Sequence, residues 1–177
     1  MPTPLVLTGG PAVGKSTTGR LLARRFTRAA FIDVDDIRQL VIAGSAAPWE
    51  GAEGLAQQEL GVLNTCGLAE RFHRYDFQVV IADVLTPHTE QLYRRHLSGC
   101  VIVRLHTTPE EVRQRARTRT VHLTDDEFEA LHFQDRQQPP AADHHLDVTS
   151  LDIASQVEAV QRLWTQTRVN DPFDTVA

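Results

Sequence analysis

Short runs of apolar residues alternate along the chain with longer stretches in which apolar residues recur every three or four positions. The short runs have the length and near-continuous hydrophobicity of strands that are buried on both faces of a sheet. The longer stretches have the spacing of helices that bury one side. This alternation predicts an α/β fold in which helices cover both faces of a parallel sheet.

The hydrophobic pattern also sets the expected boundaries of the elements. Five strands are predicted at Leu5–Thr8, Ala30–Val34, Gln78–Ala82, Val101–Leu105 and His145–Val148. Seven helices are predicted at Lys15–Phe26, Asp36–Ala43, Ala52–Tyr75, Pro87–Leu97, Glu110–Arg117, Asp125–Arg136 and Asp152–Thr167. Because 177 residues is the size of one domain, we expect residues 1–177 to form a single domain with a polar tail at 168–177.

The connection between the first strand and the first helix carries the most specific motif of the chain. Residues 9–17 read GGPAVGKST, which matches the pattern G-x-x-x-x-G-K-[ST]. A chance match in a glycine-rich turn is the alternative, but the flanking strand and helix provide the context that phosphate binding requires. The backbone N–H groups of such a loop and the positive end of the helix dipole converge on phosphates.

The motif therefore predicts that this loop binds a nucleoside triphosphate. The expected contacts from the loop are Gly10, Pro11, Ala12, Val13, Gly14, Lys15, Ser16 and Thr17. Lys15 would add a mobile cation at the outer phosphates, and the hydroxyl of Ser16 would bind Mg²⁺.

Composition narrows the class of partner. Hydrophobic residues make up 41% of the chain and charged residues 23%, which is typical of a globular protein with a substantial core. The net charge of -5 disfavours a polymeric nucleic acid as the partner, because such binders are usually basic. Cys66 and Cys100 form no C-x-x-C motif, so we expect free thiols in a reducing cytoplasm. No apolar stretch approaches membrane-spanning length, and no membrane partner is expected.

Three carboxylates and an arginine follow the second predicted strand, in the order Asp33, Asp35, Asp36 and Arg38. Ligands bind at the carboxyl ends of the strands in open parallel sheets. Asp33 and Asp35 point the same way if the strand continues, and Asp35 and Arg38 share a face if a helix begins there. A carboxylate at this place can accept the proton of an attacking hydroxyl, and the arginine can hold the acceptor or the phosphoryl group. Capping of the following helix by Asp is the alternative.

The third predicted strand ends in Val79-Val-Ile-Ala-Asp83, four apolar residues followed by an acid. In P-loop proteins an acid in this pattern contacts Mg²⁺, directly or through water. The pattern is common in α/β proteins, and its place downstream of the P-loop is what favours a function. The predicted metal site therefore combines Ser16 with Asp33 or Asp83.

An arginine-dense stretch follows the fourth predicted strand and contains Arg113, Arg115, Arg117 and Arg119. Phosphoryl transfer places negative charge on the equatorial oxygens, which a closing arginine stabilises. Arg113 and Arg117 are four residues apart and share a helix face, so we expect both to bind the nucleotide and Arg117 to act in catalysis. A lid is expected at 113–125. A solvated basic helix, balanced by neighbouring glutamates, is the alternative.

The segment 44–54 reads GSAAPWEGAEG and fits the predicted sheet poorly. Its small, flexible residues predict a loop, which we expect to lie over the substrate side. Trp49 is expected to anchor this loop, with a contact to the substrate as the alternative.

On these motifs the chain resembles the P-loop small-molecule kinases, which include chloramphenicol phosphotransferase, gluconate kinase, shikimate kinase and the adenylate kinases. The loop Leu7-Thr-Gly-Gly-Pro-Ala-Val-Gly-Lys-Ser and the segment Val34-Asp35-Asp36-Ile look like chloramphenicol phosphotransferase, in which the matching Asp is the base. Asp33-Val-Asp35 is similar to the D-x-D of shikimate kinases. Asp35-Asp36-Ile-Arg38 looks like the D-D-x-R segment of phage-type polynucleotide 5′-kinase, in which the arginine holds a phosphate of the acceptor.

The resemblance covers residues 4–165 and implies a five-stranded parallel sheet in the order 2-3-1-4-5. It also implies that Arg113 lies against adenine and that Arg117 reaches the phosphates, as the lid pair of these kinases does. Residues 120–140 resemble the gluconate-kinase lid and the helix after it. The resemblance does not identify the acceptor, because the arginines that bind shikimate and the AMP pocket of adenylate kinases have no clear counterpart here.

Together, the motifs and the resemblance predict a kinase that uses ATP and Mg²⁺ to phosphorylate a hydroxyl of a small molecule. The predicted catalytic residues are Lys15, Asp35 as the general base, Arg38 and Arg117. A polynucleotide or nucleotide 5′-kinase is one alternative, which D-D-x-R favours and the acidic charge disfavours. A nucleotide-dependent switch that hydrolyses without an acceptor is the other, and it has no need of a base at Asp35.

Overall fold

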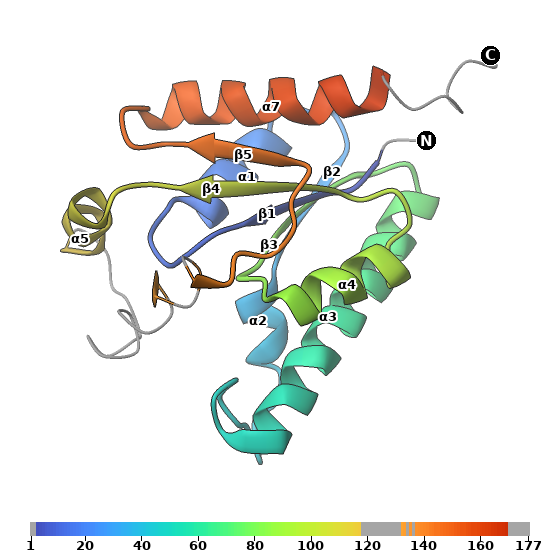
Figure 1. The fold of residues 1–177 in the computed structure, drawn as a ribbon. Helices are drawn as coiled ribbons and strands as arrows, with labels where there is room; N and C mark the ends of the chain where they lie inside the picture. The colour runs from blue at the N-terminus through green and yellow to red at the C-terminus, as the bar shows by residue number, and fades with distance from the viewer. Residues whose placement is uncertain (1–2, 118–131, 134, 136, 170–177) are drawn as a thin grey trace.

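Five parallel strands form one sheet in the order β2-β3-β1-β4-β5 (Figure 1). The computed structural model describes residues 3–117, 132–133, 135 and 137–169 of the chain. The strands are β1 (Leu5–Thr8), β2 (Ala29–Asp33), β3 (Gln78–Ala82), β4 (Val101–His106) and β5 (His144–Asp147). This architecture confirms the α/β fold class that the sequence pattern predicted and the strand order that the family resemblance implied.

Helices cover both faces of the sheet. Their bounds are α1 (Lys15–Ala23), α2 (Val34–Arg38), α3 (Gly51–Arg74), α4 (Pro87–His96), α5 (Pro109–Arg117) and α7 (Ile153–Val169). In Figure 1, α1 and α7 lie on one side of the sheet and α3 and α4 on the other. The N-terminal end of α3 extends beyond the sheet, together with the chain that connects it to α2.

Residues of β1 alternate between two hydrophobic cores because successive side chains of a strand point to opposite faces. Leu5 and Leu7 belong to the core that α1 and α7 close, whereas Val6 belongs to the core under α3 and α4. All three side chains have no exposed surface. Cys66 and Cys100 lie in the second core as buried free thiols, which agrees with the prediction for the two cysteines.

The largest difference from the predicted elements is at α2, which ends at Arg38 instead of continuing to residue 43. The N–H groups of Leu40 and Val41 bond three residues back, which tightens the chain out of the helix. Leu40 and Ile42 are exposed, so a longer helix would gain no buried apolar face to stabilise it. Because α3 begins at Gly51, the predicted loop at 44–54 is confined to residues before that position.

Some predicted features fall outside the described residues. They are most of the helix expected at Asp125–Arg136, the lid beyond residue 117 and the tail beyond residue 169. In the part of the chain that the structure describes, no helix combines the length and the apolar character needed to cross a membrane.

Replacing Trp164 by alanine should lower the free energy of unfolding by about 3–5 kcal/mol, because it removes the largest side chain from the core beneath α7. Trp164 is 1% exposed, meets Phe26 edge to face, and donates from Nε1 to the carbonyl oxygen of Thr3 (2.9 Å). Urea denaturation measures the effect. Gln166→Ala, an exposed position on the same helix, is the control and should change stability by less than about 0.5 kcal/mol. Equal losses in the two variants would contradict this assignment of the core.

Candidate active site

The loop between β1 and α1 has a backbone that only certain residues can adopt. Gly9 and Gly14 have φ values of 131° and 100°, and Ala12, which carries a Cβ, has a φ of 59°. A Cβ on Gly9 would press into the carbonyl oxygen of Leu105 on β4. Helix α1 starts directly after Gly14, and no side chain caps it. The backbone N–H groups of its first turn are therefore available to an anion bound at the loop.

Lys15 folds back over this loop and donates from Nζ to the carbonyl oxygens of Gly9 (2.8 Å) and Gly10 (2.9 Å). Burial lowers the pKa of Lys15, while nearby carboxylates act in the opposite direction. Those carboxylates belong to Asp35, Asp83, Asp135 and Asp33. The predicted cation of the P-loop and the predicted acids from β2 and β3 therefore share one site.

A glutamine from α7 supports the loop from behind. The Nε2 of Gln156 donates to the carbonyl oxygen of Val13 (3.3 Å) and to the hydroxyl of Thr18 (2.7 Å), and the side chain packs against Gly14. Gln156 is buried. Sequence reasoning missed this residue. Gln156 lies four residues before Val160 and therefore on the apolar face of α7. A polar residue on such a face indicates that its side chain has a buried hydrogen-bond partner.

Arg115 of α5 reaches the P-loop in the described structure. Its Nη2 donates to the carbonyl oxygen of Val148 (3.0 Å), and its Nη1 lies 3.5 Å from the carbonyl oxygen of Val13. Arg113 is exposed, and Arg117 is the last residue of α5, with a side chain outside the described part. The buried Val112 fixes the rotation of the helix, and Arg115, three residues later, lies on the same side as Val112.

The acids after β2 do not continue the strand. β2 ends at Asp33, whose Oδ1 accepts a bond from the N–H of Asp35 (3.4 Å) and so caps α2. Asp33 and Asp36 each lie 3.9 Å from the guanidinium of Arg20. The side chains of Asp35 and Asp36 are 71% and 70% exposed, and of these two Asp35 is the one that lies against Arg38, at 3.1 Å.

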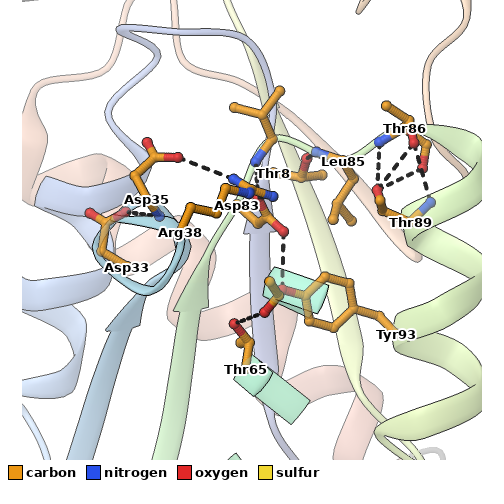
Figure 2. A network of polar contacts seen from close by, with 12 residues as sticks. Thr8, Asp33, Asp35, Arg38, Thr65, Asp83, Leu85, Thr86, Thr89 and Tyr93 are labelled. Carbon is orange, nitrogen blue, oxygen red and sulfur yellow. Dashed lines mark hydrogen bonds and ion pairs between the residues drawn. The ribbon is translucent and has the colours of Figure 1, made fainter. Parts of the chain in front are cut away.

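Arg38 joins Asp35 to a buried acid (Figure 2). Its Nη1 donates to Oδ1 of Asp35 (3.1 Å), and its Nη2 donates to Oδ1 of Asp83 (2.8 Å). Asp83 also accepts from the N–H of Val84 on Oδ1 (2.8 Å) and from the hydroxyl of Tyr93 on Oδ2 (3.0 Å). Sequence reasoning did not anticipate Tyr93, which lies on the buried side of α4 and places a phenol at the end of β3.

Burial and charge act against each other at this network. Burial raises the pKa of Asp83, and Arg38 together with the Tyr93 hydroxyl acts in the opposite direction. Burial alone would lower the pKa of Arg38, but Asp83 and Asp35 raise it above its ordinary value. Burial and the Asp83 carboxylate raise the pKa of Tyr93 well above the usual range, which keeps its hydroxyl protonated and donating.

The predicted metal ligands are only partly suited to bind a cation directly. Asp83 already accepts from three donors, and Asp33 caps α2. Among the described residues, no three His, Cys, Asp or Glu side chains are grouped closely enough to hold a metal. Ser16, in the first turn of α1, is half-buried beside Lys15. An ion at this loop would therefore take most of its ligands from phosphate oxygens.

A second buried ion pair lies beside the P-loop. Arg104, on β4, donates from Nη2 to Oδ2 of Asp135 (2.7 Å), and both side chains are almost fully buried. The ring of His132 packs against Gly10 so closely that a Cβ there would not fit. Sequence reasoning missed this pair because it joins residues that are far apart in the chain and lack a shared motif.

Comparison with solved structures gives matches over nearly the whole chain. A sugar kinase from Janibacter sp. HTCC2649 has a TM-score of 0.71 and 14% sequence identity, over 94% of this chain and 96% of that one. A gluconokinase from Sinorhizobium meliloti 1021 has a TM-score of 0.66 and 20% identity, over 99% and 98%. A shikimate kinase from Bacteroides thetaiotaomicron has a TM-score of 0.64 and 21% identity, over 94% and 98%. The sequence matches no protein-family model and no curated protein significantly.

Replacing Arg38 by methionine should lower the free energy of unfolding by roughly 3 kcal/mol near neutral pH, because it leaves the buried Asp83 without its counter-charge. The matched control is Arg20→Met, whose ion pairs are longer and more exposed, and its loss should stay below about 1 kcal/mol.

The loss in the Arg38→Met variant should also depend on pH. Without Arg38 the pKa of Asp83 rises further, so the folded state binds a proton more readily than the unfolded state. The difference in stability from the unmodified chain should therefore shrink as the pH falls from 8 to 5.5. Urea denaturation at both values measures it, and a loss that grows on acidification would contradict the assignment.

Proposed function

We propose that this chain, which has the fold of the P-loop small-molecule kinases, transfers the γ-phosphate of ATP to a hydroxyl group of a small molecule. One observation carries the proposal: an exposed carboxylate, Asp35, is held by Arg38, which also binds Asp83, and the N–H of Asp83 donates to the carbonyl oxygen of Leu7 on the strand that leads into the P-loop. A nucleotide-binding loop with an acceptor base beside it is the minimum that phosphoryl transfer to an alcohol requires.

The nucleotide half of the site has clear roles for its residues. The N–H groups of the P-loop and Lys15 would bind the β- and γ-phosphates, and Arg115 would hold the lid helix against the loop through Val13. Mg²⁺, bound by the phosphates and Ser16, would neutralise the charge that develops on the transferred group. Arg117 is proposed to reach the same phosphates, which rests on the sequence alone.

The acceptor half would supply the base. In the proposed reaction the acceptor oxygen forms a bond to the γ-phosphorus, the bond from that phosphorus to the bridging oxygen breaks, and ADP leaves. The proton of the hydroxyl passes to Asp35. Arg38 holds this carboxylate in place, and Asp83 with Tyr93 holds Arg38.

The two alternatives receive less support. A nucleotide switch has no use for a base that a buried ion pair holds beside the P-loop. A 5′-kinase of the D-D-x-R type would use Arg38 to bind a phosphate of the acceptor, and that phosphate would compete with the carboxylates of Asp35 and Asp83, which already accept from Arg38. Salt-sensitive binding of a short oligonucleotide would favour that alternative.

Asp35→Asn tests the proposal. This variant keeps the shape of the side chain but cannot take a proton, so acceptor-stimulated release of ADP should fall at least about a hundredfold while Mg·ATP binds nearly normally. Asp36→Asn is the control, since Asp36 points to Arg20, and its turnover should be nearly unchanged. An Asp35→Asn variant with full turnover would remove the base from the mechanism, and release of ADP that no alcohol stimulates would refute the kinase itself.

A second comparison separates the arginines of α5. Arg115→Ala should weaken ATP binding about tenfold, because it removes the contacts of the lid helix with Val13 and Val148. Arg113→Ala should have the smaller effect because Arg113 is exposed in the described structure. Isothermal titration with a non-hydrolysable ATP analogue measures both. The larger loss in Arg113→Ala would instead favour the contact with adenine that the family resemblance implies.

A further inference from the structure

Gly10, in the phosphate loop, has a neighbour that the motif does not explain. A Cβ built on Gly10 would lie 2.5 Å from both Nδ1 and Cε1 of His132, so no other residue fits there unless that ring moves. Residue 10 is one of the variable positions of G-x-x-x-x-G-K-[ST], and its φ lies outside the left-handed region that favours glycine. The contact with His132, and not the motif or the backbone, is therefore what requires a glycine here.

A buried ion pair fixes the segment that carries His132. Residues 132, 133 and 135 are helical, so the side chains of His132 and Asp135, three positions apart, lie on one face. Arg104 on β4 donates from Nη2 to Oδ2 of Asp135 (2.7 Å) and to its carbonyl oxygen (3.0 Å), and from Nε to Oδ1 (3.3 Å). The two side chains are 12% and 9% exposed. These bonds between charged and almost fully buried groups hold the turn, and His132 with it, at one place on the sheet.

That place is the edge of the sheet from which the phosphate loop leaves. Arg104 is paired in register with Thr8, the last residue of β1, and the loop begins at the next residue. The ion pair therefore docks a segment more than a hundred residues along the chain beside the loop.

Two side chains with nitrogen donors converge on Gly10. Nζ of Lys15 donates to its carbonyl oxygen (2.9 Å), and the ring of His132 occupies the space where a Cβ would lie. In the P-loop motif this lysine binds the outer phosphates of a nucleoside triphosphate. An imidazole N–H is a hydrogen-bond donor, and its bond to a phosphate oxygen is strengthened by the charge of the phosphate.

We infer that His132 contacts the terminal phosphate of the nucleotide and makes the site bind ATP more tightly than ADP. This inference rests on the nucleotide half of the proposed function. A ring N–H of His132 donates to an oxygen of the terminal phosphate beside Lys15, and this contact is lost once the phosphate has moved to the acceptor. The phosphate is then held both by the loop and by a side chain that is anchored, through Asp135, to β4.

His132→Ala tests the contact by removing the ring. Its affinity for a non-hydrolysable ATP analogue should fall about tenfold, and its affinity for ADP should change less than about twofold, because ADP lacks the terminal phosphate. Isothermal titration with the Mg²⁺ complexes measures both. Phe133→Ala is the matched control, since Phe133 is the adjacent residue and is 59% exposed, and it should alter neither affinity.

Gly10→Ala tests the same contact from the loop. The added methyl group displaces the ring, so this variant should also bind the ATP analogue about tenfold more weakly. In the His132→Ala background the same change should cost less than about twofold more, because the ring that it displaces is already absent. Losses that multiply in the double variant would contradict the inference, since the methyl group would then disturb the loop without acting through His132.

The outcomes separate this inference from the proposed function. Equal weakening of the ATP analogue and of ADP in His132→Ala would overturn the inference, because the ring would then support the loop without meeting the terminal phosphate. Unchanged affinities for both nucleotides would overturn it as well. An unmodified chain that binds neither nucleotide would refute the nucleotide half of the proposed function, and this inference with it. The expected preference for the ATP analogue, without acceptor-stimulated release of ADP, would refute only the transfer to an alcohol.

Discussion

The carboxylate of Asp83 is the constraint on which the acceptor side of the structure depends. Its side chain has no exposed surface, and a buried charge costs several kcal/mol unless it is compensated. The compensation comes from Arg38 on α2, the N–H of Val84 and the hydroxyl of Tyr93 on α4. Withdrawing α2 would remove the counter-charge, so a single buried acid at the end of β3 holds α2, and Asp35 with it, at the edge of the sheet.

The same arginine determines how closely α3 can approach. Gly61 lies under the side chain of Arg38, where a Cβ would sit 3.1 Å from Cγ. This close approach lets α3 cover both the ion pair and the second hydrophobic core, which Val62 and Cys66 join from the following positions. The close packing of α3 against α2 thus depends on the small residue that lies over one ion pair.

The fold could be predicted from sequence because it depends on local patterns. Apolar strands that alternate with amphipathic helices specify a parallel α/β sheet, and the structure has that sheet in the order that the family resemblance implied. The partners of Asp83 could not be predicted, because Tyr93 and Arg38 meet it only through tertiary contacts. The contact of Arg115 with the P-loop was within reach of the sequence, since the spacing from Val112 fixes the buried side of α5.

The stability of the buried acid and the position of Asp35 are coupled because one guanidinium binds both carboxylates. A change that drew Arg38 away from Asp83 would leave the buried carboxylate without its counter-charge and would also release Asp35. The loop between β1 and α1 has no such dependence, because its donors are the backbone N–H groups of the first helical turn and the ammonium of Lys15. The backbone of the fold therefore determines the loop, whereas the position of Asp35 depends on individual side chains.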